Sequence, residues 1–311
     1  MTELAVNVAG LDLVNPVMTA SGCAAAGREL APFFDLTSIG AVVTKTVMRA
    51  ARSGRPTPRM AETPSGMLNS IGLQGPGIDS FIDNDLTWLA ERGVTTVVSI
   101  AGGDPDEFAE LAGRLAGHDG VAALEVNISC PNVANRGLVF ACDPGASRDV
   151  VSGVVDVVAG RKPVFAKLSP DVTDVVAIAR SVLEAGADGL AAINTLLGVV
   201  IDPATLKPQL AVNTGGLSGP AIRPVALRVV WQLAGAMRAG ALPDVPIVGI
   251  GGIRTGEDAL AFLAAGASAV QVGTVIFHDP SAPVRIAREL AEALDARGIG
   301  SVAEVVGAAF G

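Results

Sequence analysis

Residues 124–133 read Leu-Glu-Val-Asn-Ile-Ser-Cys-Pro-Asn-Val, and this stretch decides how we interpret the chain. It predicts a strand whose carboxyl end delivers an amide, a hydroxyl and a thiol into the loop that follows. A cysteine without other cues is most often a small buried hydrophobic residue. Cys130, however, follows polar residues and precedes a proline that ends the hydrogen-bond ladder of the strand. We therefore expect its thiol at the mouth of the strand, where it can act on a ligand.

Apolar runs of the same kind recur along the chain and alternate with helix-like stretches. We expect strands near residues 16–20, 41–44, 95–100, 121–128, 163–168, 188–194, 246–250 and 268–273. We expect helices near residues 28–38, 79–92, 105–116, 146–159, 173–186, 223–239, 256–266 and 282–297. Continuously apolar strands are typical of a parallel sheet covered on both faces. Eight alternations in about 300 residues predict an α/β fold, the (β/α)8 TIM barrel. A doubly wound open sheet is the alternative, because periodicity cannot show closure.

Shorter signals refine this architecture. Residues 4–13 alternate apolar and polar side chains around a glycine, which predicts an N-terminal β-hairpin. Asp104 is followed by a proline and then by acidic residues, a pattern typical of a capped helix start. The stretches 52–77 and 202–224 are rich in proline and glycine and follow the second and sixth strands. In a barrel both would be elaborated loops on the C-terminal face, where active sites are built.

Composition narrows the function. The chain has 311 residues, half of them hydrophobic, and a net charge of −9. An acidic protein is a poor partner for nucleic acid or an anionic membrane, because both reward basic surfaces. The three cysteines, Cys23, Cys130 and Cys142, form no paired motif, which favours a reducing compartment. We see no secretory signal and no apolar run of membrane-spanning length, so we expect a cytoplasmic protein with residues 1–311 in one domain.

Polar side chains stand at the carboxyl ends of the predicted strands. Two of the four lysines, Lys45 and Lys167, terminate apolar strands, whereas a typical lysine lies on a solvated surface. Asn127 and Asn194 end strands in the same manner, and this parallel placement favours a polar ligand over simple turn formation. The other strand-end positions are Ser21, Thr46, Ser99, Thr195 and Thr274.

Glycines follow the last two strands. Gly251 and Gly252 come after the seventh strand and precede a helix capped by Thr255, and Gly273 follows the eighth strand. Glycines let backbone N–H groups approach a phosphate, and a helix N-terminus favours negative charge. The loops after strands 7 and 8 are the recurrent phosphate site of barrels. A third glycine of the dinucleotide fingerprint is absent, so we expect a mononucleotide phosphate and no intrinsic NAD site.

The two histidines exclude other chemistry. His118 precedes the fourth strand, on the opposite face, and His278 lies beyond the eighth. Without a histidine at a strand mouth, a metal-dependent hydrolase or a histidine acid/base enzyme is disfavoured, and we expect no metal. The thiol of Cys130 is then the leading candidate for proton transfer, while Cys23 and Cys142 are interpreted as structural.

The motifs of this chain resemble the class 1 dihydroorotate dehydrogenases. The resembling segments lie at residues 15–22, 44–46, 58–59, 69–74, 127–133, 166–170, 194–196, 215–220, 251–253 and 271–274. Cys130 separates the match from the membrane-bound class 2, which has a serine there. Residues 127–133 resemble the B type, which passes electrons to NAD through a separate iron–sulfur flavoprotein subunit. Gly75 departs from the asparagine that this pattern usually carries after Gly-Leu-Gln.

The resemblance implies an FMN enzyme of de novo pyrimidine synthesis that oxidises (S)-dihydroorotate to orotate. It implies a base, Cys130, that removes the C5 proton while hydride passes from C6 to flavin N5. The substrate residues that it implies are Lys45, Asn69, Ser70, Ile71, Gly72, Leu73, Asn127, Asn194 and Thr195. The implied FMN residues are Ser21, Lys45, Thr46, Ser99, Asn127, Lys167, Ile193, Gly219, Gly251, Gly252, Gly273 and Thr274.

The chemistry of the side chains agrees with these implied roles. Lys45 can neutralise the orotate carboxylate as a point charge, and Lys167 can stabilise negative charge on reduced flavin. The resemblance further implies a homodimer and an iron–sulfur/FAD partner that links the enzyme to NAD, and we expect an apolar patch near the flavin edge, with the Arg-rich loop after strand 2 at its rim. The rival interpretations are a dihydropyrimidine dehydrogenase-like flavin subunit and a barrel lyase or isomerase that binds a phosphate ligand without flavin. The complete set of strand-end residues disfavours an idle binding subunit.

Overall fold

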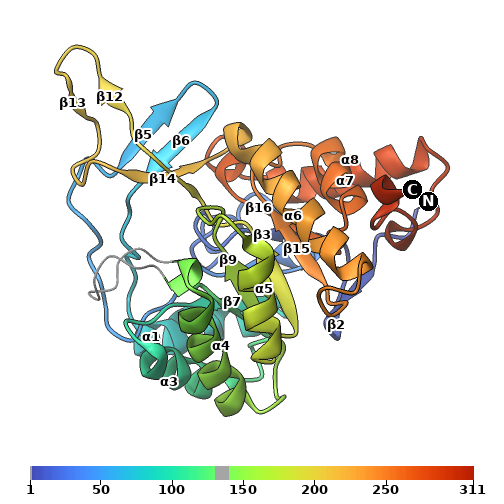
Figure 1. The fold of residues 1–311 in the computed structure, drawn as a ribbon, viewed down its shortest axis with the longest axis horizontal. Coiled ribbons are helices and arrows are strands. Elements are labelled where there is room, and N and C mark those ends of the chain that lie inside the picture. Colours follow the sequence, from blue (N-terminus) through green and yellow to red (C-terminus); the bar gives the residue numbers. More distant parts are fainter. Residues whose placement is uncertain (1, 130–139) are drawn as a thin grey trace.

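Eight parallel strands close into a barrel at the centre of the molecule (Figure 1). The computed structural model describes residues 2–129 and 140–311. Around the barrel the strands are β3 (Val17–Thr19), β16 (Ala269–Val272), β15 (Ile247–Ile250), β10 (Gly189–Ala192), β9 (Val164–Leu168), β8 (Ala123–Val126), β7 (Thr96–Ile100) and β4 (Val42–Val43). The seam between β3 and β4 is closed by backbone hydrogen bonds, from Thr19 N to Ala41 O at 3.2 Å and from Gly40 N to Val17 O at 2.8 Å. The predicted TIM barrel is confirmed, and the open-sheet alternative is wrong.

Helices cover the outside of the barrel. They are α1 (Ile78–Ser80), α2 (Thr87–Ala90), α3 (Pro105–Ala116), α4 (Pro144–Val158), α5 (Val175–Glu184), α6 (Arg223–Arg238), α7 (Gly256–Ala264) and α8 (Ala282–Asp295), with a π-helical stretch, Phe81–Leu86, between α1 and α2. The predicted cap at Asp104 is present, because its carboxylate accepts from Glu107 N at 2.8 Å. The Glu107 carboxylate in turn accepts from Gly103 N at 2.7 Å, so both sides of the helix start are satisfied. No helix in the described part of the chain has the length and apolar character needed to cross a membrane.

One predicted helix is wrong. Residues 28–38 form turns that end in a short 3-10 helix, Leu36–Ser38, where the Asp35 side chain caps the N–H of Thr37. Pro32 lies in the middle of this segment, and a proline inside a helix removes a backbone donor and clashes with the preceding turn. The apolar residues Leu30 and Leu36 are buried all the same, so their spacing reflects core packing without a helix. The remaining 3-10 helices are Phe140–Cys142, Pro220–Ile222, Thr274–Phe277, Val302–Glu304 and Ala308–Phe310.

The predicted N-terminal hairpin closes the end of the barrel opposite the strand mouths. Its strands, β1 (Val6–Val8) and β2 (Leu11–Leu13), pair antiparallel. Val8 and Leu13 are buried and pack with inward-facing strand residues, among them Phe165 and Val248. This apolar layer excludes water from the base of the barrel, so polar chemistry is confined to the other end.

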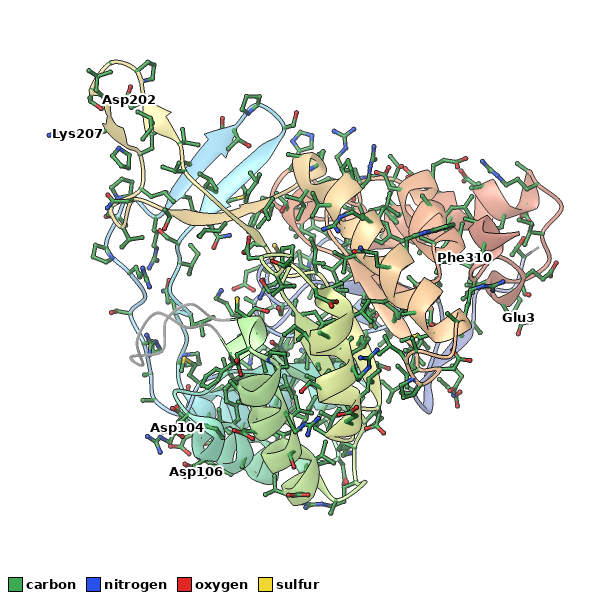
Figure 2. All side chains as sticks on the ribbon, in the orientation of Figure 1. Glu3, Asp104, Asp106, Asp202, Lys207 and Phe310 are labelled. Atoms are coloured by element: carbon green, nitrogen blue, oxygen red, sulfur yellow. The ribbon has the colours of Figure 1, made fainter. Side chains whose placement is uncertain are left out.

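The two proline- and glycine-rich loops pair with each other. The first contributes β5 (Met60–Thr63) and β6 (Gly66–Asn69), and the second contributes β14 (Gly215–Ser218). Together with β11 (Leu196–Gly198), which precedes the second loop, they form a sheet in the antiparallel order β11-β14-β6-β5. A small hairpin, β12 (Ile201–Asp202) with β13 (Lys207–Pro208), extends from it, and Asp202 and Lys207 lie at its outer end (Figure 2). This second sheet lies beside the mouth of the barrel (Figure 1), so both loops help to build the surroundings of the site.

Candidate active site

A chain of hydroxyl and amide groups crosses the mouth of the barrel. Thr46 Oγ1 and Ser99 Oγ share a hydrogen bond of 3.0 Å, and Asn127 Nδ2 donates to Thr46 Oγ1 at 3.2 Å. Asn194 Nδ2 donates to Asn127 Oδ1 at 3.0 Å, and Asn194 Oδ1 accepts from Thr195 N at 2.9 Å. These groups follow or end β4, β7, β8 and β10, so the structure brings together five of the predicted site residues.

Lys167 reaches the same mouth from inside the barrel. It belongs to β9, is 3% exposed, and donates from Nζ to Ser21 Oγ at 3.0 Å. A second bond from Nζ goes to Glu125 Oε1 at 3.1 Å. An ammonium group has three N–H donors, so Lys167 keeps one donor beyond the two acceptors found among the described residues. Such a fixed, charged donor suits a ligand that carries or develops negative charge.

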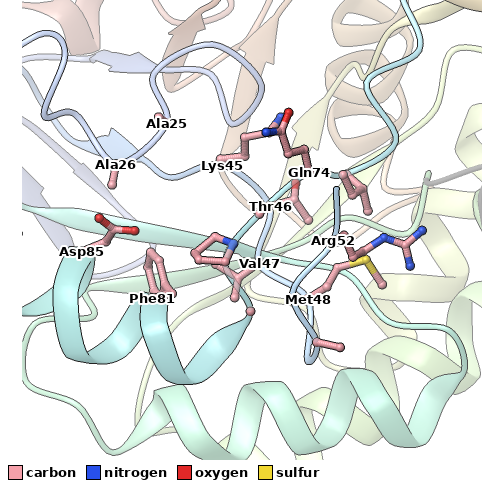
Figure 3. A pocket seen from close by; sticks show the side chains of 15 residues that line it. Ala25, Ala26, Lys45, Thr46, Val47, Met48, Arg52, Gln74, Phe81 and Asp85 are labelled. Carbon is pink, nitrogen blue, oxygen red and sulfur yellow. The ribbon is translucent and has the colours of Figure 1, made fainter. Parts of the chain in front are cut away.

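Lys45 borders a pocket of about 380 Å3 (Figure 3). Burial lowers the pKa of Lys45, and the positive charge of Arg59 acts in the same direction, whereas Cys23 opposes them. Within the described ranges, no carboxylate lies at ion-pair distance from the Lys45 ammonium. A partly buried lysine without a counter-ion is costly, so this position favours an anionic ligand.

The predicted substrate loop, residues 69–73, begins at the end of β6. Asn69 Nδ2 donates to Gly216 O at 3.4 Å, which ties this loop to β14. The Ser70 hydroxyl is buried, and no hydrogen-bond partner for it occurs in the part of the chain that the structure describes. Gly72 and Leu73 have positive φ angles of 78° and 52°, and Leu73 lines the pocket beside Lys45. The loop thus brings the backbone turn at Leu73 beside the lysine and carries an unsatisfied hydroxyl at Ser70.

The predicted phosphate loops meet at the mouths of β15 and β16. Gly252 has φ 74°, and a Cβ there would lie 2.8 Å from Gly219 O, so a glycine at 252 lets the loop after β15 approach the segment after β14. The backbone N–H groups of Gly252, Gly273 and Thr274 find no acceptor among residues 2–129 and 140–311. Three free N–H donors from two adjacent loops fit a phosphate group. Gly251 and Ile193 stand at the ends of their strands, and Ile193 is buried.

One part of the phosphate prediction is wrong. The N-terminus of α7 is not open to a ligand, because the N–H of Gly256 donates to Glu289 Oε2 at 2.8 Å. The side chain of Thr255 occupies a second N–H, that of Asp258, at 3.2 Å. A Cβ at Gly256 would also lie 2.3 Å from the backbone of α8, so the helix start is packed against protein. Among the described residues at these two strand mouths, the free N–H donors are those of the glycine loops.

The thiols are distributed unevenly. Cys130 lies outside the described residues, as do Pro131, Asn132 and Val133, which follow it in the motif. Cys23 lies at the mouth, where burial raises the pKa of its thiol to about 11 against the opposing charges of Lys45 and Lys167. Cys142 is exposed. At neutral pH Cys23 is therefore protonated, which agrees with its interpretation as structural.

Sequence reasoning missed Glu125. It belongs to β8, is 1% exposed and forms an ion pair with Lys167 in the barrel interior. The signal was present, because a lone carboxylate in an apolar strand requires a buried partner. Lys167 is the matching charge in another apolar strand. In the described residues there is no cluster of three acidic, histidine or cysteine side chains that could hold a metal ion.

Fold and site together define a barrel enzyme with charged, amide and hydroxyl groups at the carboxyl ends of its strands. A family model described as dihydroorotate dehydrogenase matches residues 3–294. The chain belongs to the dihydroorotate dehydrogenase family, whose members are oxidoreductases.

Full-length relatives share half of the sequence. The chain is 51% identical over 306 residues to a protein of Geobacter sp. strain M21, with 98% of each chain covered. It is 52% identical over 306 residues to one of Pelobacter propionicus, again with 98% of each covered. A protein of Geobacillus kaustophilus is 47% identical over 307 residues, covering 99% of this chain and 96% of the relative. All three are named dihydroorotate dehydrogenase B (NAD(+)), catalytic subunit. The predicted B-type resemblance is confirmed.

Proposed function

We propose that this protein is the catalytic subunit of a B-type dihydroorotate dehydrogenase, which oxidises (S)-dihydroorotate to orotate in de novo pyrimidine synthesis. The observation that carries this proposal is the arrangement of Lys45 beside the chain of amides at the barrel mouth. An unpaired ammonium suits a carboxylate, and Asn127 and Asn194 present donors and acceptors to a planar ring. The relatives, which are named for this activity and matched along their whole length, support the same assignment.

The described residues fit FMN as cofactor. The three free N–H groups of Gly252, Gly273 and Thr274 suit its phosphate, and Lys167, held by Ser21, suits the pyrimidine end of its ring. Thr46, Ser99, Asn127, Ile193, Gly219 and Gly251 complete the proposed FMN site. When bound, FMN supplies the hydride acceptor of the reaction, at N5. Lys167 then provides fixed positive charge where the reaction places negative charge.

The remaining residues bind the substrate and move its proton. In this proposal Lys45 pairs with the carboxylate, and Asn69, Ser70, Ile71, Gly72, Leu73 and Thr195 surround the ring. Cys130 takes the proton from C5 of the substrate. The residues around the ring hold the substrate in a fixed orientation relative to Cys130. Fixing the reacting groups in this way is the usual advantage of a preorganised site.

The assembly is part of the proposal. We propose that residues 1–311 form one FMN-binding domain in the cytoplasm and that two copies pair through the second sheet. Leu197 of β11 and, in the adjoining segment that carries the β12–β13 hairpin, Val199, Ile201 and Leu206 are exposed, which supports burial against another copy. We further propose an iron–sulfur/FAD partner that carries electrons to NAD. Arg52, from the Arg-rich loop after β4, lines the pocket beside Lys45, which supports docking near that edge.

The colour of the purified protein tests the cofactor and the substrate together. We expect a yellow protein that bleaches anaerobically with dihydroorotate but not with dihydrouracil, because only dihydroorotate carries the carboxylate for Lys45. Bleaching by dihydrouracil instead would indicate the dihydropyrimidine dehydrogenase-like alternative. A colourless protein that gains no flavin on reconstitution would favour the barrel lyase or isomerase.

The two lysines should separate in their effects. Lys45→Ala is expected to weaken orotate binding roughly 10- to 100-fold, in line with the loss of one partly buried charge-assisted bond, and to change uracil binding little. Lys167→Ala is expected instead to lower the reduction potential of bound FMN or its retention. Orotate and uracil titrations measure the first effect, and redox titration and assay of the retained FMN measure the second. Lys162→Ala, at the opposite end of β9, is the control for both. An identical ligand profile in the two site variants would contradict the assigned roles.

A further inference from the structure

Glu125 is a buried carboxylate in the middle of the barrel. Its side chain is 1% exposed and points inward from β8, above the apolar layer that the hairpin helps to form. Val8, Leu13, Met18 and Phe165 line the space beneath it. An ionised carboxylate in such surroundings is costly unless it is paired and hydrogen-bonded. Its presence therefore calls for an explanation that core packing does not supply.

Both oxygens of Glu125 are engaged from different sides of the barrel. Oε1 accepts from Lys167 Nζ on the neighbouring strand β9 at 3.1 Å. Oε2 accepts from Gln271 Nε2 on β16 at 2.8 Å. The carboxylate thus has a fixed orientation. With Ser21 Oγ on the other side of the ammonium at 3.0 Å, Lys167 is held between two acceptors.

We propose that Glu125 is a positioning residue that holds the Lys167 ammonium, charged and aimed, at the FMN ring. The proposal rests on the FMN site proposed above. A lysine side chain has a flexible four-carbon stem, so its charge acts at a definite place only when it is anchored. Glu125 supplies both the counter-charge that makes burial of the ammonium tolerable and one of its two anchors. Gln271 fixes the carboxylate from the far side and does not touch Lys167.

The test measures how much more tightly the protein binds reduced FMN than oxidised FMN. The ratio is calculated from the difference between the midpoint potentials of bound and free FMN. Both potentials are measured by equilibration with redox dyes. Glu125→Gln keeps the size of the side chain and removes its charge, so Lys167 loses its counter-ion. We expect the ratio to fall about tenfold, which for a two-electron couple is about 30 mV. Glu125→Asp, which restores the charge, should recover part of it.

Two comparisons separate positioning from a general structural effect. Gln271→Met removes the contact to the other carboxylate oxygen but keeps the charge of Glu125 and its bond to Lys167. The ratio should therefore fall less than in Glu125→Gln, by about twofold at most. In a Lys167→Met background, Glu125→Gln should produce no further change, because it acts only through the lysine. If Glu125→Gln loses FMN altogether, the comparison is made with Glu125→Asp, which should shift the ratio in the same direction.

Several results would overturn the inference. The inference fails if Glu125→Gln leaves the ratio unchanged. It also fails if Gln271→Met lowers the ratio as much as Glu125→Gln does. It fails, finally, if Glu125→Gln has the same effect in the Lys167→Met background as in the wild type. A rise would mean that Glu125 acts on the flavin through its own charge. The proposed function fails in a different way: a wild-type protein that binds no FMN, or whose FMN is not reduced by dihydroorotate, refutes the enzyme assignment before any variant is compared.

Discussion

Replacing Cys130 with serine is expected to slow flavin reduction by dihydroorotate roughly 10²- to 10⁴-fold, the usual range for the loss of a general base. A serine hydroxyl is somewhat smaller than the thiol and a far weaker acid, so almost none of it is ionised at neutral pH. FMN binding should be retained, because the proposed FMN contacts come from other residues. Anaerobic stopped-flow reduction of the flavin measures the rate. Reduction at the wild-type rate would remove Cys130 from the mechanism.

The pH dependence identifies which thiol acts. A base works in its deprotonated form, so the rate should rise with pH through the pKa of the thiol, near ~8.5 for an ordinary cysteine. Burial raises the pKa of Cys23 to about 11, so a Cys23 base would leave the rate rising well beyond that range. Cys142→Ser is the matched control, because this exposed thiol lies outside the proposed site and should leave the rate unchanged.

Much of the fold was predictable because its signals are local. Strands such as Val164–Leu168 are apolar at every position except one, since both faces of a parallel barrel are covered. Helix starts were predictable where a cap is written in the sequence, as at Asp104 and Thr255. The strand-end rule then placed Lys45, Asn127 and Asn194 at one mouth, because the carboxyl ends of parallel strands meet there.

The rest depends on contacts between distant segments. The pairing of β6 with β14 joins residues about 150 positions apart, and both strands contain glycines and lack a regular alternation. Residues 28–38 carry helix-like apolar spacing, but they form turns, because Pro32 interrupts a helix and the apolar residues pack into the core without one. The start of α7 looked like a phosphate site in the sequence, yet Glu289 of α8 occupies it.

Glu125 shows the same limit within the site. In the sequence it is one charged residue inside an apolar strand, with nothing to say whether it faces the barrel interior or the helices. Only the closed barrel places it within 3.1 Å of Lys167 and within 2.8 Å of Gln271, which comes from the opposite end of the chain. Lys167 could be identified from its own strand in the sequence. The residue that positions it could be identified only once the neighbouring strand was known.

The isolated chain is expected to be reduced by dihydroorotate and reoxidised by artificial dyes, but not to reduce NAD. The glycines after β15 lack the third glycine of a dinucleotide fingerprint, and the free N–H groups there suit one phosphate. In our proposal FMN occupies that site, so NAD has no second place to bind and must be reached through another protein. Anaerobic mixing of dihydroorotate-reduced protein with NAD, followed by the absorbance of NADH, measures the transfer.

Addition of the electron-transfer subunit should make NAD reduction appear. Without that subunit we expect no NAD reduction, because in our proposal no direct route to NAD exists. Fumarate is the informative second oxidant. It is small enough to reach the barrel mouth after orotate leaves, so rapid fumarate turnover would move the chain to the A type. Robust NAD turnover by this polypeptide alone would refute the separation of the two sites. For a B-type catalytic subunit we expect reoxidation by dyes and by the partner subunit, and only slow reoxidation by fumarate. The reason is that the reduced flavin must persist until the partner accepts the electrons.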